Sequence, residues 1–425
     1  MSFHLSKPTL IEGRREWALF LLFSAAVFAL SLGVRYYLFK DFTSRDKVFA
    51  AAEVLLQYTK SKNGRSYEVL KLKTDDGVTF YTTSKEPIKN LSGRRVTLLI
   101  FPKRVSFKEY LSTPYIPSVL TGVEHERSVR MELFGKIRKE HSHPWLQELF
   151  GALFLAIPIS KELRERVNLL GINHLLALSG FHMGLLWLIL YGGLGMLYKP
   201  LQQRFFPWRH RLLDVGAVTL LLLGAYLIFT GMPPSLMRAY AMVVVGWIAL
   251  LFGFELLSFS FLAFCVVLLL ALFPPLLFSV GFWFSVSGLF FIYQFLNLSE
   301  GWSRWVLVPL LNIWVYLAML PVVHSIFGTF SLYQLLSIPL TLLFSLFYPL
   351  AIALHTVGLG SLADGWIVEL LQLPENSSSV EVFTPLWILA LFVSLSILAL
   401  FRRVALYLQA GFILLFFLFL VKQIA

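Results

Sequence analysis

Residues 384–421 read TPLWILALFVSLSILALFRRVALYLQAGFILLFFLFLV, and this stretch decides the class of fold. It contains two apolar runs, 384–401 and 404–421, which are separated only by Arg402 and Arg403. Each run approaches the length of about 20 residues that a helix needs to cross the hydrocarbon core of a bilayer. The stretch therefore predicts two membrane-spanning helices joined by a short, positively charged loop.

The same pattern recurs through most of the chain. Of its 425 residues, 57% are hydrophobic and 14% are charged, whereas about 25% of the residues in a soluble domain are charged. Further candidate spans cover residues 17–39, 174–198, 213–230, 235–252, 276–296, 305–327 and 332–354, with a shorter one at 259–273. We therefore expect a predominantly α-helical, multi-pass membrane protein with about eight to eleven transmembrane helices.

The first apolar run has basic residues before it, as a secretory signal does. Arg14 and Arg15 precede residues 17–39. That run is longer than the apolar core of about 7–15 residues in a cleaved signal, and no small-residue cleavage motif follows it. Residues 1–45 are therefore expected to form a cytoplasmic tail and a retained signal-anchor helix. Cys265 is the only cysteine, which excludes disulfides within the chain and metal sites built from several cysteines.

A hydrophilic segment between the first and second apolar runs is predicted to form strands. Four β-type segments occupy residues 48–58, 66–72, 78–83 and 95–101. The dipeptides Asn63-Gly64 and Asp76-Gly77 separate the first three, and such dipeptides favour tight hairpin turns. Four or five strands in so short a segment indicate a small all-β, OB-like barrel over residues 46–112.

The segment that follows changes to helical spacing. Residues 119–150 are densely charged and predict an amphipathic helix near the membrane surface. Residues 149–159 are apolar but too few to cross a bilayer, so an interfacial or re-entrant position is expected. Residues 113–165 are therefore assigned to interfacial helices and residues 166–425 to a polytopic membrane domain.

Charge is concentrated in the first extramembrane segment. Residues 40–148 contain 20 Lys and Arg against 13 Asp and Glu. Such a basic surface favours nucleic acid or anionic lipid as a partner, although an ordinary solvated surface explains the charge equally well. Arg14, Arg15 and the four basic residues of loop 199–212 favour a cytoplasmic side, which places the β domain in the periplasm.

Polar residues interrupt the apolar pattern first at residues 171–184, which read GINHLLALSGFHMG. Polar groups inside membrane segments are costly and tend to mark a pathway, so His174, Ser179 and His182 are candidate pore-lining residues. In one continuous helix the two histidines would lie about 80° apart around the axis. Glycines that permit a helix break or close packing are Gly171, Gly180 and Gly184. The alternative is that each histidine donates one structural hydrogen bond to a neighbouring helix.

The second interruption is at residues 230–239, which read TGMPPSLMRA. Pro233 and Pro234 stop the preceding helix, and Gly231 precedes them. Broken backbone at membrane depth survives only where protein or a water-filled cavity satisfies it, so Ser235 and Arg238 are candidates for the same pathway. Asp214 is a helix length away and is not expected to pair with Arg238. The alternative is that Arg238 extends to the lipid headgroups.

Signatures of cofactors and hydrolytic enzymes are absent from the sequence. His141 and His143 supply only two metal ligands, with no Asp-His pair after them, and the chain has no P-loop. His324 and His355 are isolated in the sequence, which is typical of structural histidines. No metal, cofactor or catalytic activity is therefore predicted.

Together, the two interrupted segments resemble the core of the ComEC competence family. The pattern GxxHLLAxSGxH is matched at Gly171, His174, Leu175, Leu176, Ala177, Ser179, Gly180 and His182, and GxxxSxxRAxxM at Gly231, Ser235, Arg238, Ala239 and Met242. The resemblance covers residues 149–355 and extends to the signal-anchor and OB-like module before them. It implies a channel for uptake of single-stranded DNA across the bacterial cytoplasmic membrane during natural transformation.

The resemblance also implies partners, and the sequence departs from the family in places. Implied partners are single-stranded DNA of any sequence, membrane lipids, a periplasmic DNA receptor, and a cytoplasmic helicase or single-strand-binding protein; a homodimer is also conceivable. Many members end in a metallo-β-lactamase-like domain, whose His-x-His-x-Asp-His run does not occur here. Gln334 replaces a frequent Asn, and residues 156–159 replace a frequent acidic turn.

Two other classes of protein share some of these features. A secondary transporter of small solutes or lipids would also use broken helices and polar groups inside the membrane. It would leave the basic β domain unexplained. A membrane hydrolase would use Ser179 and His182, but a pair of this kind without an orienting acid is a poor catalytic set.

Overall fold

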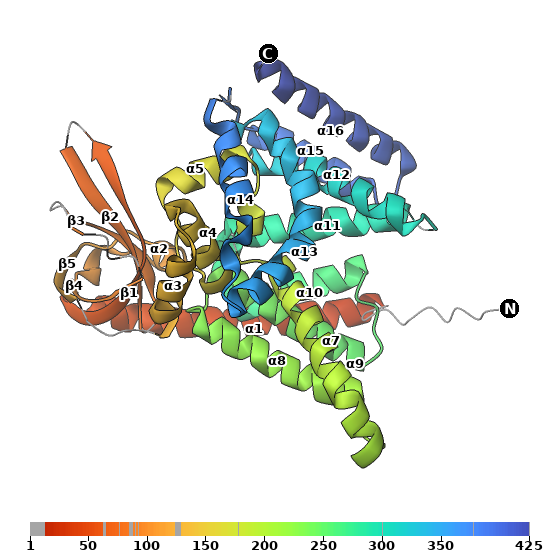
Figure 1. The fold of residues 1–425 in the computed structure, drawn as a ribbon, viewed down its shortest axis with the longest axis horizontal. Helices are drawn as coiled ribbons and strands as arrows, with labels where there is room; N and C mark the ends of the chain where they lie inside the picture. Colours follow the sequence, from red (N-terminus) through yellow and green to blue (C-terminus); the bar gives the residue numbers. More distant parts are fainter. Residues whose placement is uncertain are drawn as a thin grey trace.

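The computed structural model describes residues 13–62, 65–75, 77–84, 88–89, 91, 93–123, 129–176, 178–299, 301–376 and 378–424. A small β domain lies at one end of a large helical body, at the left in Figure 1. The turn dipeptide Asn63-Gly64, Asp76 and Ala177 fall outside the described residues.

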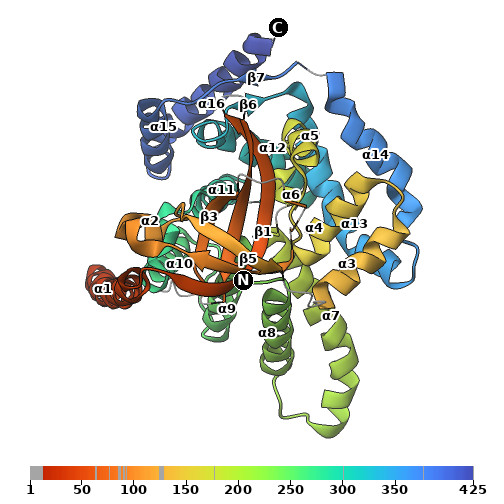
Figure 2. The same cartoon turned by 90° about the vertical axis from the view of Figure 1, so that its left-hand side faces the viewer.

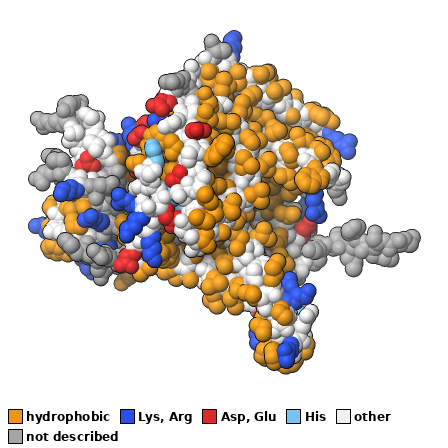
Figure 3. Space-filling model, viewed as in Figure 1, with side chains coloured by type: hydrophobic (Ala, Val, Ile, Leu, Met, Phe, Trp, Pro, Cys, Tyr) orange, Lys and Arg blue, Asp and Glu red, His pale blue; other side chains and the backbone are white. Residues whose placement is uncertain are grey.

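The helical body confirms the multi-pass membrane fold. Among the described residues, seven helical segments are long and apolar enough to span a bilayer. They are α1 (Arg14–Ser44), α7 (Gly180–Phe205), α8 (Arg211–Phe229), α11 (Val280–Leu298), α12 (Arg304–Val323), the segment Leu332–Thr356, which combines η3 (Leu332–Leu336) with α13 (Ser337–Thr356), and α16 (Arg403–Ile424). Three shorter apolar helices are α9 (Pro234–Leu251), α10 (Phe259–Leu272) and α15 (Leu386–Leu398). Apolar side chains cover the helical body in Figure 3, as a lipid-facing surface requires.

The β domain is a five-stranded antiparallel sheet with the order β3-β2-β1-β4-β5. Its strands are β1 (Val48–Lys62), β2 (Arg65–Thr74), β3 (Thr79–Ser84), β4 (Arg95–Ile100) and β5 (Ser118–Val123). A parallel bridge between Tyr81, in β3, and Tyr115, just before β5, brings the two edges of the sheet together. Alternating residues such as Leu72, Phe80 and Leu98 are fully buried and fill the interior.

Two helices, α3 (Val129–Glu140) and α4 (Pro144–Leu155), lie between β5 and α5 (Lys161–Leu169). The expected helix over residues 119–150 is wrong at its start, because residues 119–123 belong to β5 and pair with β4. The sheet thus continues beyond residue 112, the expected end of the β domain. Figure 2 shows α1 and α2 (Phe107–Leu111) on one flank of the sheet and α3 and α4 on the other.

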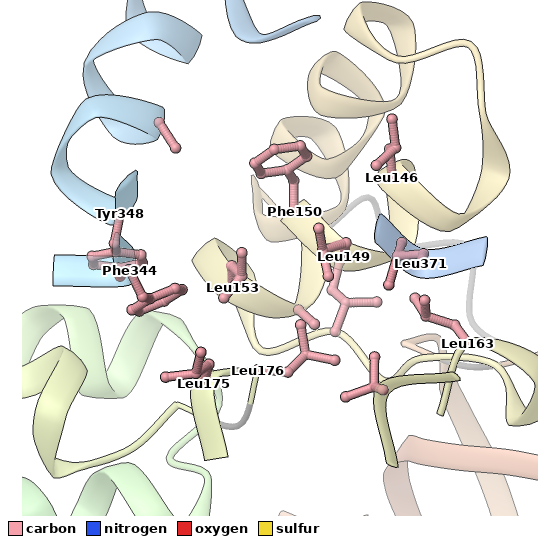
Figure 4. Packing of buried hydrophobic residues seen from close by; sticks show 14 of the residues in the cluster. Leu146, Leu149, Phe150, Leu153, Leu163, Leu175, Leu176, Phe344, Tyr348 and Leu371 are labelled. Carbon is pink, nitrogen blue, oxygen red and sulfur yellow. The ribbon is translucent and has the colours of Figure 1, made fainter. Parts of the chain in front are cut away.

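The apolar segment expected in an interfacial or re-entrant position packs against other helices. Leu146, Leu149, Phe150 and Leu153 of α4 pack against α5, α13 and α14 (Asp364–Gln372), as Figure 4 shows. This cluster forms the largest core of the described chain. A helix too short to cross a bilayer is stabilised when other helices cover its apolar side chains.

The remaining elements are short. They are α6 (Asn173–Leu176), η1 (Pro102–Arg104), η2 (Pro274–Phe278), η4 (Gly360–Ala363), η5 (Leu373–Asn376), β6 (Thr329–Phe330) and β7 (Val380–Glu381). The helix expected over residues 174–198 therefore begins later, at Gly180, and α6 is a separate turn before it.

Candidate functional site

His182 lies in the first turn of α7, in a fully buried position. The backbone N–H of Ser179, the residue before α7, donates to His182 Nδ1 at 3.3 Å. A neutral ring then carries its proton on Nε2, and Nε2 is buried without a hydrogen-bond partner among the described residues. The rings of Phe344 and Tyr348 of α13 lie edge-on to His182, with centroids 5.1 and 4.9 Å away.

His174 lies on the separate turn α6 and is exposed at the protein surface. Its Nδ1 is 3.1 Å from the Gly171 carbonyl and its Nε2 is 3.0 Å from Thr341 Oγ1 of α13. His174 and His182 do not share one continuous helix, because α6 ends at Leu176 and α7 begins at Gly180, so the separation of about 80° does not apply. Both histidines nevertheless lie against α13.

The glycines of the first motif differ in what surrounds them. Gly171 has φ +70°, and a Cβ atom there would lie 3.1 Å from Gln334 Cβ, so the residue that departs from the family pattern packs directly on the motif. A Cβ at Gly180 would lie 3.9 Å from Ala239 of α9. At Gly184 a Cβ would meet nothing within 4 Å, so the structure shows no close packing there.

The break between α8 and α9 lies beside the β domain. Gly231 and Met232 both have left-handed backbone, with φ +80° and +55°. Pro233 caps α9 and Ser235 lies half-buried in its first turn. Lys73 Nζ of β2 donates to the Gly231 carbonyl at 3.0 Å. The β domain thus satisfies part of the broken backbone.

Arg238 of α9 is buried within the helical body, with 9% of the residue exposed. Its Nη1 donates to Ser279 Oγ at 3.1 Å, and a Cβ at Gly281 of α11 would lie 3.0 Å from its Nη2. The guanidinium therefore packs within the helical body, and no carboxylate pairs with it among the described residues. Asp214 pairs with Arg209 at the far end of α8, as expected from its distance. No described contact joins Arg238 to His174 or His182.

A cavity of about 180 Å³ lies where the β domain meets the α8–α9 break. We call it the junction cavity; it is lined by Glu53, Val54, Leu55, Lys71, Lys73, Thr79, Arg130, Ala156, Pro158, Thr230, Gly231, Met232 and Pro233. Arg130 of α3 donates from Nε to the Leu155 carbonyl, from Nη2 to the Ala156 carbonyl and from Nη1 to Glu53 Oε1, at 2.8, 2.9 and 2.8 Å.

Three basic residues that were not predicted as candidate site residues line the junction cavity: Lys71, Lys73 and Arg130. Lys71 and Lys73 alternate with the buried Leu72 and Thr74 along β2, so both project from the outer face of the sheet. Burial lowers the pKa of the Lys71 amine, and Arg164 adds to this shift. A bound anion would relieve both effects, because it favours the charged amine. The alternation of residues along β2 could have predicted that the two lysines share one face of the sheet. Nothing in the sequence places Arg130 beside them.

A second polar cluster joins α3, α13 and α14. His141 Nδ1 is 2.9 Å from Asp364 Oδ1, and His141 Nε2 is 3.0 Å from His355 Nε2. His355 Nδ1 donates to the Ala351 carbonyl at 2.6 Å. His355, isolated in the sequence, thus lies next to His141 in the fold. In the part of the chain that the structure describes, no group of three or more His, Cys, Asp and Glu side chains is arranged to hold a metal ion.

The comparison with protein families identifies the helical body. A family model described as Competence protein matches residues 157–423, which include both interrupted segments and the break beside the junction cavity. The match excludes the β domain and Arg130. No curated protein and no solved structure matches the chain. The match covers well over half of the sequence, and the chain therefore belongs to the competence protein family, which is involved in DNA uptake.

Proposed function

We propose that the protein is a channel that carries one strand of DNA across the bacterial cytoplasmic membrane, without sequence preference. One observation supports this most strongly: the basic face of the β domain and the broken helix of the competence region line the same cavity. DNA is bound largely through its phosphates, so a path for it needs positive charge next to a break in the helical body. The junction cavity provides both.

The topology of the β domain supports a role in binding a single strand. Its order β3-β2-β1-β4-β5, with Tyr81 and Tyr115 bridging the two edges, is that of a five-stranded, partly open barrel. Barrels of the OB type bind single strands in basic grooves with aromatic rings. We therefore assign the domain to this type and to DNA binding.

The two ends of α8 support an orientation of the protein in the membrane. Arg209 and Asp214 pair at one end, next to the basic loop, and the junction cavity lies at the other end. Basic loops favour the cytoplasmic side. We propose a cytoplasmic N-terminus and a periplasmic β domain. Incoming DNA is then handed over by a receptor in the periplasm and received by a helicase or single-strand-binding protein in the cytoplasm.

The two rival functions find less support. A transporter of small solutes or lipids would explain the broken helix but not the three cationic side chains that the β domain and α3 bring to the cavity. A hydrolase would require an acid to orient His182, and its Nε2 has no partner among the described residues. We therefore propose transport without catalysis.

Binding of a fluorescently labelled oligothymidylate to the full chain in detergent tests the proposal. We expect affinity to fall steeply with salt, and the slope of log K against log [salt] to decrease by about 0.7 for each phosphate contact removed in Lys71→Gln or Lys73→Gln. Lys422→Gln, at the end of α16 and far along the chain from the cavity, is the matched control. Absence of binding by the wild-type chain would favour the transporter.

A further inference from the structure

Glu53 is the one carboxylate among the described residues that line the junction cavity, against the cations Lys71, Lys73 and Arg130. We propose that Glu53 holds the place of a DNA phosphate, and that an incoming phosphodiester displaces its carboxylate from Arg130. This proposal rests on the proposed transport of DNA, and adds to it a binding step that the resting protein blocks.

Arg130 is built to keep its position while its anion changes. Its Nε and Nη2 donate to the main-chain carbonyls of Leu155 and Ala156, which are fixed by the end of α4. Only Nη1 donates to Glu53. Carboxylate and phosphate oxygens accept guanidinium hydrogen bonds in the same planar geometry. A phosphate oxygen in the place of Glu53 Oε1 therefore leaves the rest of the site unchanged.

The ion pair is accessible from the cavity. The Glu53 side chain is 29% exposed and the Arg130 side chain 12% exposed. The volume of about 180 Å³ is several times the roughly 30 Å³ that one water molecule occupies. A Cβ at Gly231 would lie 3.2 Å from Arg130 Nη1 and 3.5 Å from Glu53 Oε2, so the glycine keeps this space open. An anion that enters also meets Lys73.

The displaced carboxylate has partners within the sheet. Glu53 stands directly opposite Lys73 on β2 and directly opposite Arg95 on β4. Opposite charges in such cross-strand positions attract each other. Arg95 already pairs with Asp75, so Lys73 is the neighbour to which Glu53 can turn from Arg130. The exchange breaks the ion pair between Glu53 and Arg130. It forms two others, one between the phosphate and Arg130 and one between Glu53 and its cross-strand neighbour, with no proton transferred and no covalent bond changed.

Tethering explains why the exchange selects a strand over a free anion. Glu53 is part of the same chain, so its effective concentration at Arg130 is high, on the order of millimolar or above. A small anion in solution competes poorly with it. A strand already bound along the basic β domain presents its next phosphate at a similarly high local concentration, and can displace the carboxylate.

Oligothymidylate binding to the full chain in detergent, at a fixed salt concentration, tests the exchange. Glu53→Gln removes the competing charge without changing shape, and should tighten the Kd about fivefold to tenfold. Glu53→Asp keeps the charge but shortens the reach to Arg130, and should also tighten binding. Arg130→Gln should weaken binding and abolish the gain from Glu53→Gln in the double variant, because the gain acts through Arg130.

Glu68→Gln is the matched control, since Glu68 lies on β2 and bonds to Gln57 and Thr59. Its change in affinity should stay below about twofold. Exchange at Arg130 is overturned if Glu53→Gln gives no gain, if Glu68→Gln gives an equal gain, or if the gain persists in the double variant with Arg130→Gln. A wild-type chain that does not bind, together with a Glu53→Gln chain that does not bind, overturns the transport function itself.

Discussion

Arg238 is the clearest single-residue test of the transport path. The guanidinium is buried against Ser279 with no carboxylate partner in the described chain, and an arginine inside a bilayer costs about 2.5–3.5 kcal/mol on insertion scales. Passing phosphates would supply the missing counter-charge. We expect Arg238→Gln to lower DNA uptake about 100-fold, the factor that corresponds to this energy, at near-normal membrane abundance.

Arg238→Lys should give an intermediate uptake frequency, because it keeps the charge but loses the planar fork. Ser279→Ala removes the neutral partner of Arg238, together with the N-cap bond that Ser279 Oγ accepts from the Phe282 N–H at 3.3 Å. It keeps the Arg238 charge, so it is the matched control and should transform almost normally. Uptake at the wild-type frequency in Arg238→Gln would show that this residue serves packing and that the strand passes elsewhere.

Gly231 gives a residue-scale test of the helix break. Its φ of +80° disfavours any side chain, and a Cβ would also press on Arg130 Nη1. We expect Gly231→Ala to lower the free energy of unfolding by about 1–2 kcal/mol, measured by thermal unfolding in detergent. In Gly184→Ala the added methyl meets open space within a helix, so stability should rise or stay constant. Equal effects at both positions would contradict this account.

At the scale of elements, the pair His141–His355 connects α3 to the end of α13. His141→Ala would leave the Asp364 carboxylate and His355 Nε2 without their partner, and an unsatisfied buried group costs about 1–3 kcal/mol. We expect a loss of stability in this range in detergent. The matched control is His210→Ala, since His210 is exposed and makes no side-chain cap bond. An unchanged unfolding midpoint in His141→Ala would show that the cluster does not hold α3 in place.

The positions of helices and strands could be predicted where the local sequence pattern alone determines them. Apolar length located α8, α12 and α16 to within a few residues. The strand β5 was missed because it is specified by pairing with β4 across an intervening helix, which no local period reveals. Gly180 indicated either a helix break or close packing, and the sequence did not decide between them, since the segment is as apolar as a helix and Ser179 becomes a cap only in three dimensions.

At the scale of the whole molecule, the sequence predicted a basic domain and a broken helix, but not their meeting. The two sides of the junction, Lys73 and Gly231, are 158 positions apart in the chain. Composition shows that charge is present, and Figure 3 shows Lys and Arg gathered over the β domain and its neighbouring helices. Only the tertiary fold decides that Lys71, Lys73 and Arg130 line one cavity. The candidate site could therefore be predicted in its parts and not in its assembly.

The orientation of the whole molecule is tested by two reporter fusions. The first fusion follows Val123, because a fusion before β5 would remove this strand from the sheet. The second belongs in the loop between α7 and α8, at Pro207. The α8 helix of 19 residues is about 28 Å long and separates this loop from the cavity, so the two fusions must report opposite sides of the membrane.

We expect alkaline phosphatase, which is active only outside the cytoplasm, to be active after Val123 and inactive at Pro207, and a cytoplasmic reporter to give the reverse. The basic residues before α1 and in the α7–α8 loop set this direction. Equal signals at both positions would contradict the path of α8 through the membrane. Opposite signals of the reverse sign would keep the fold but place the junction cavity inside the cell, where it would meet DNA leaving the channel and Glu53 would act at the exit.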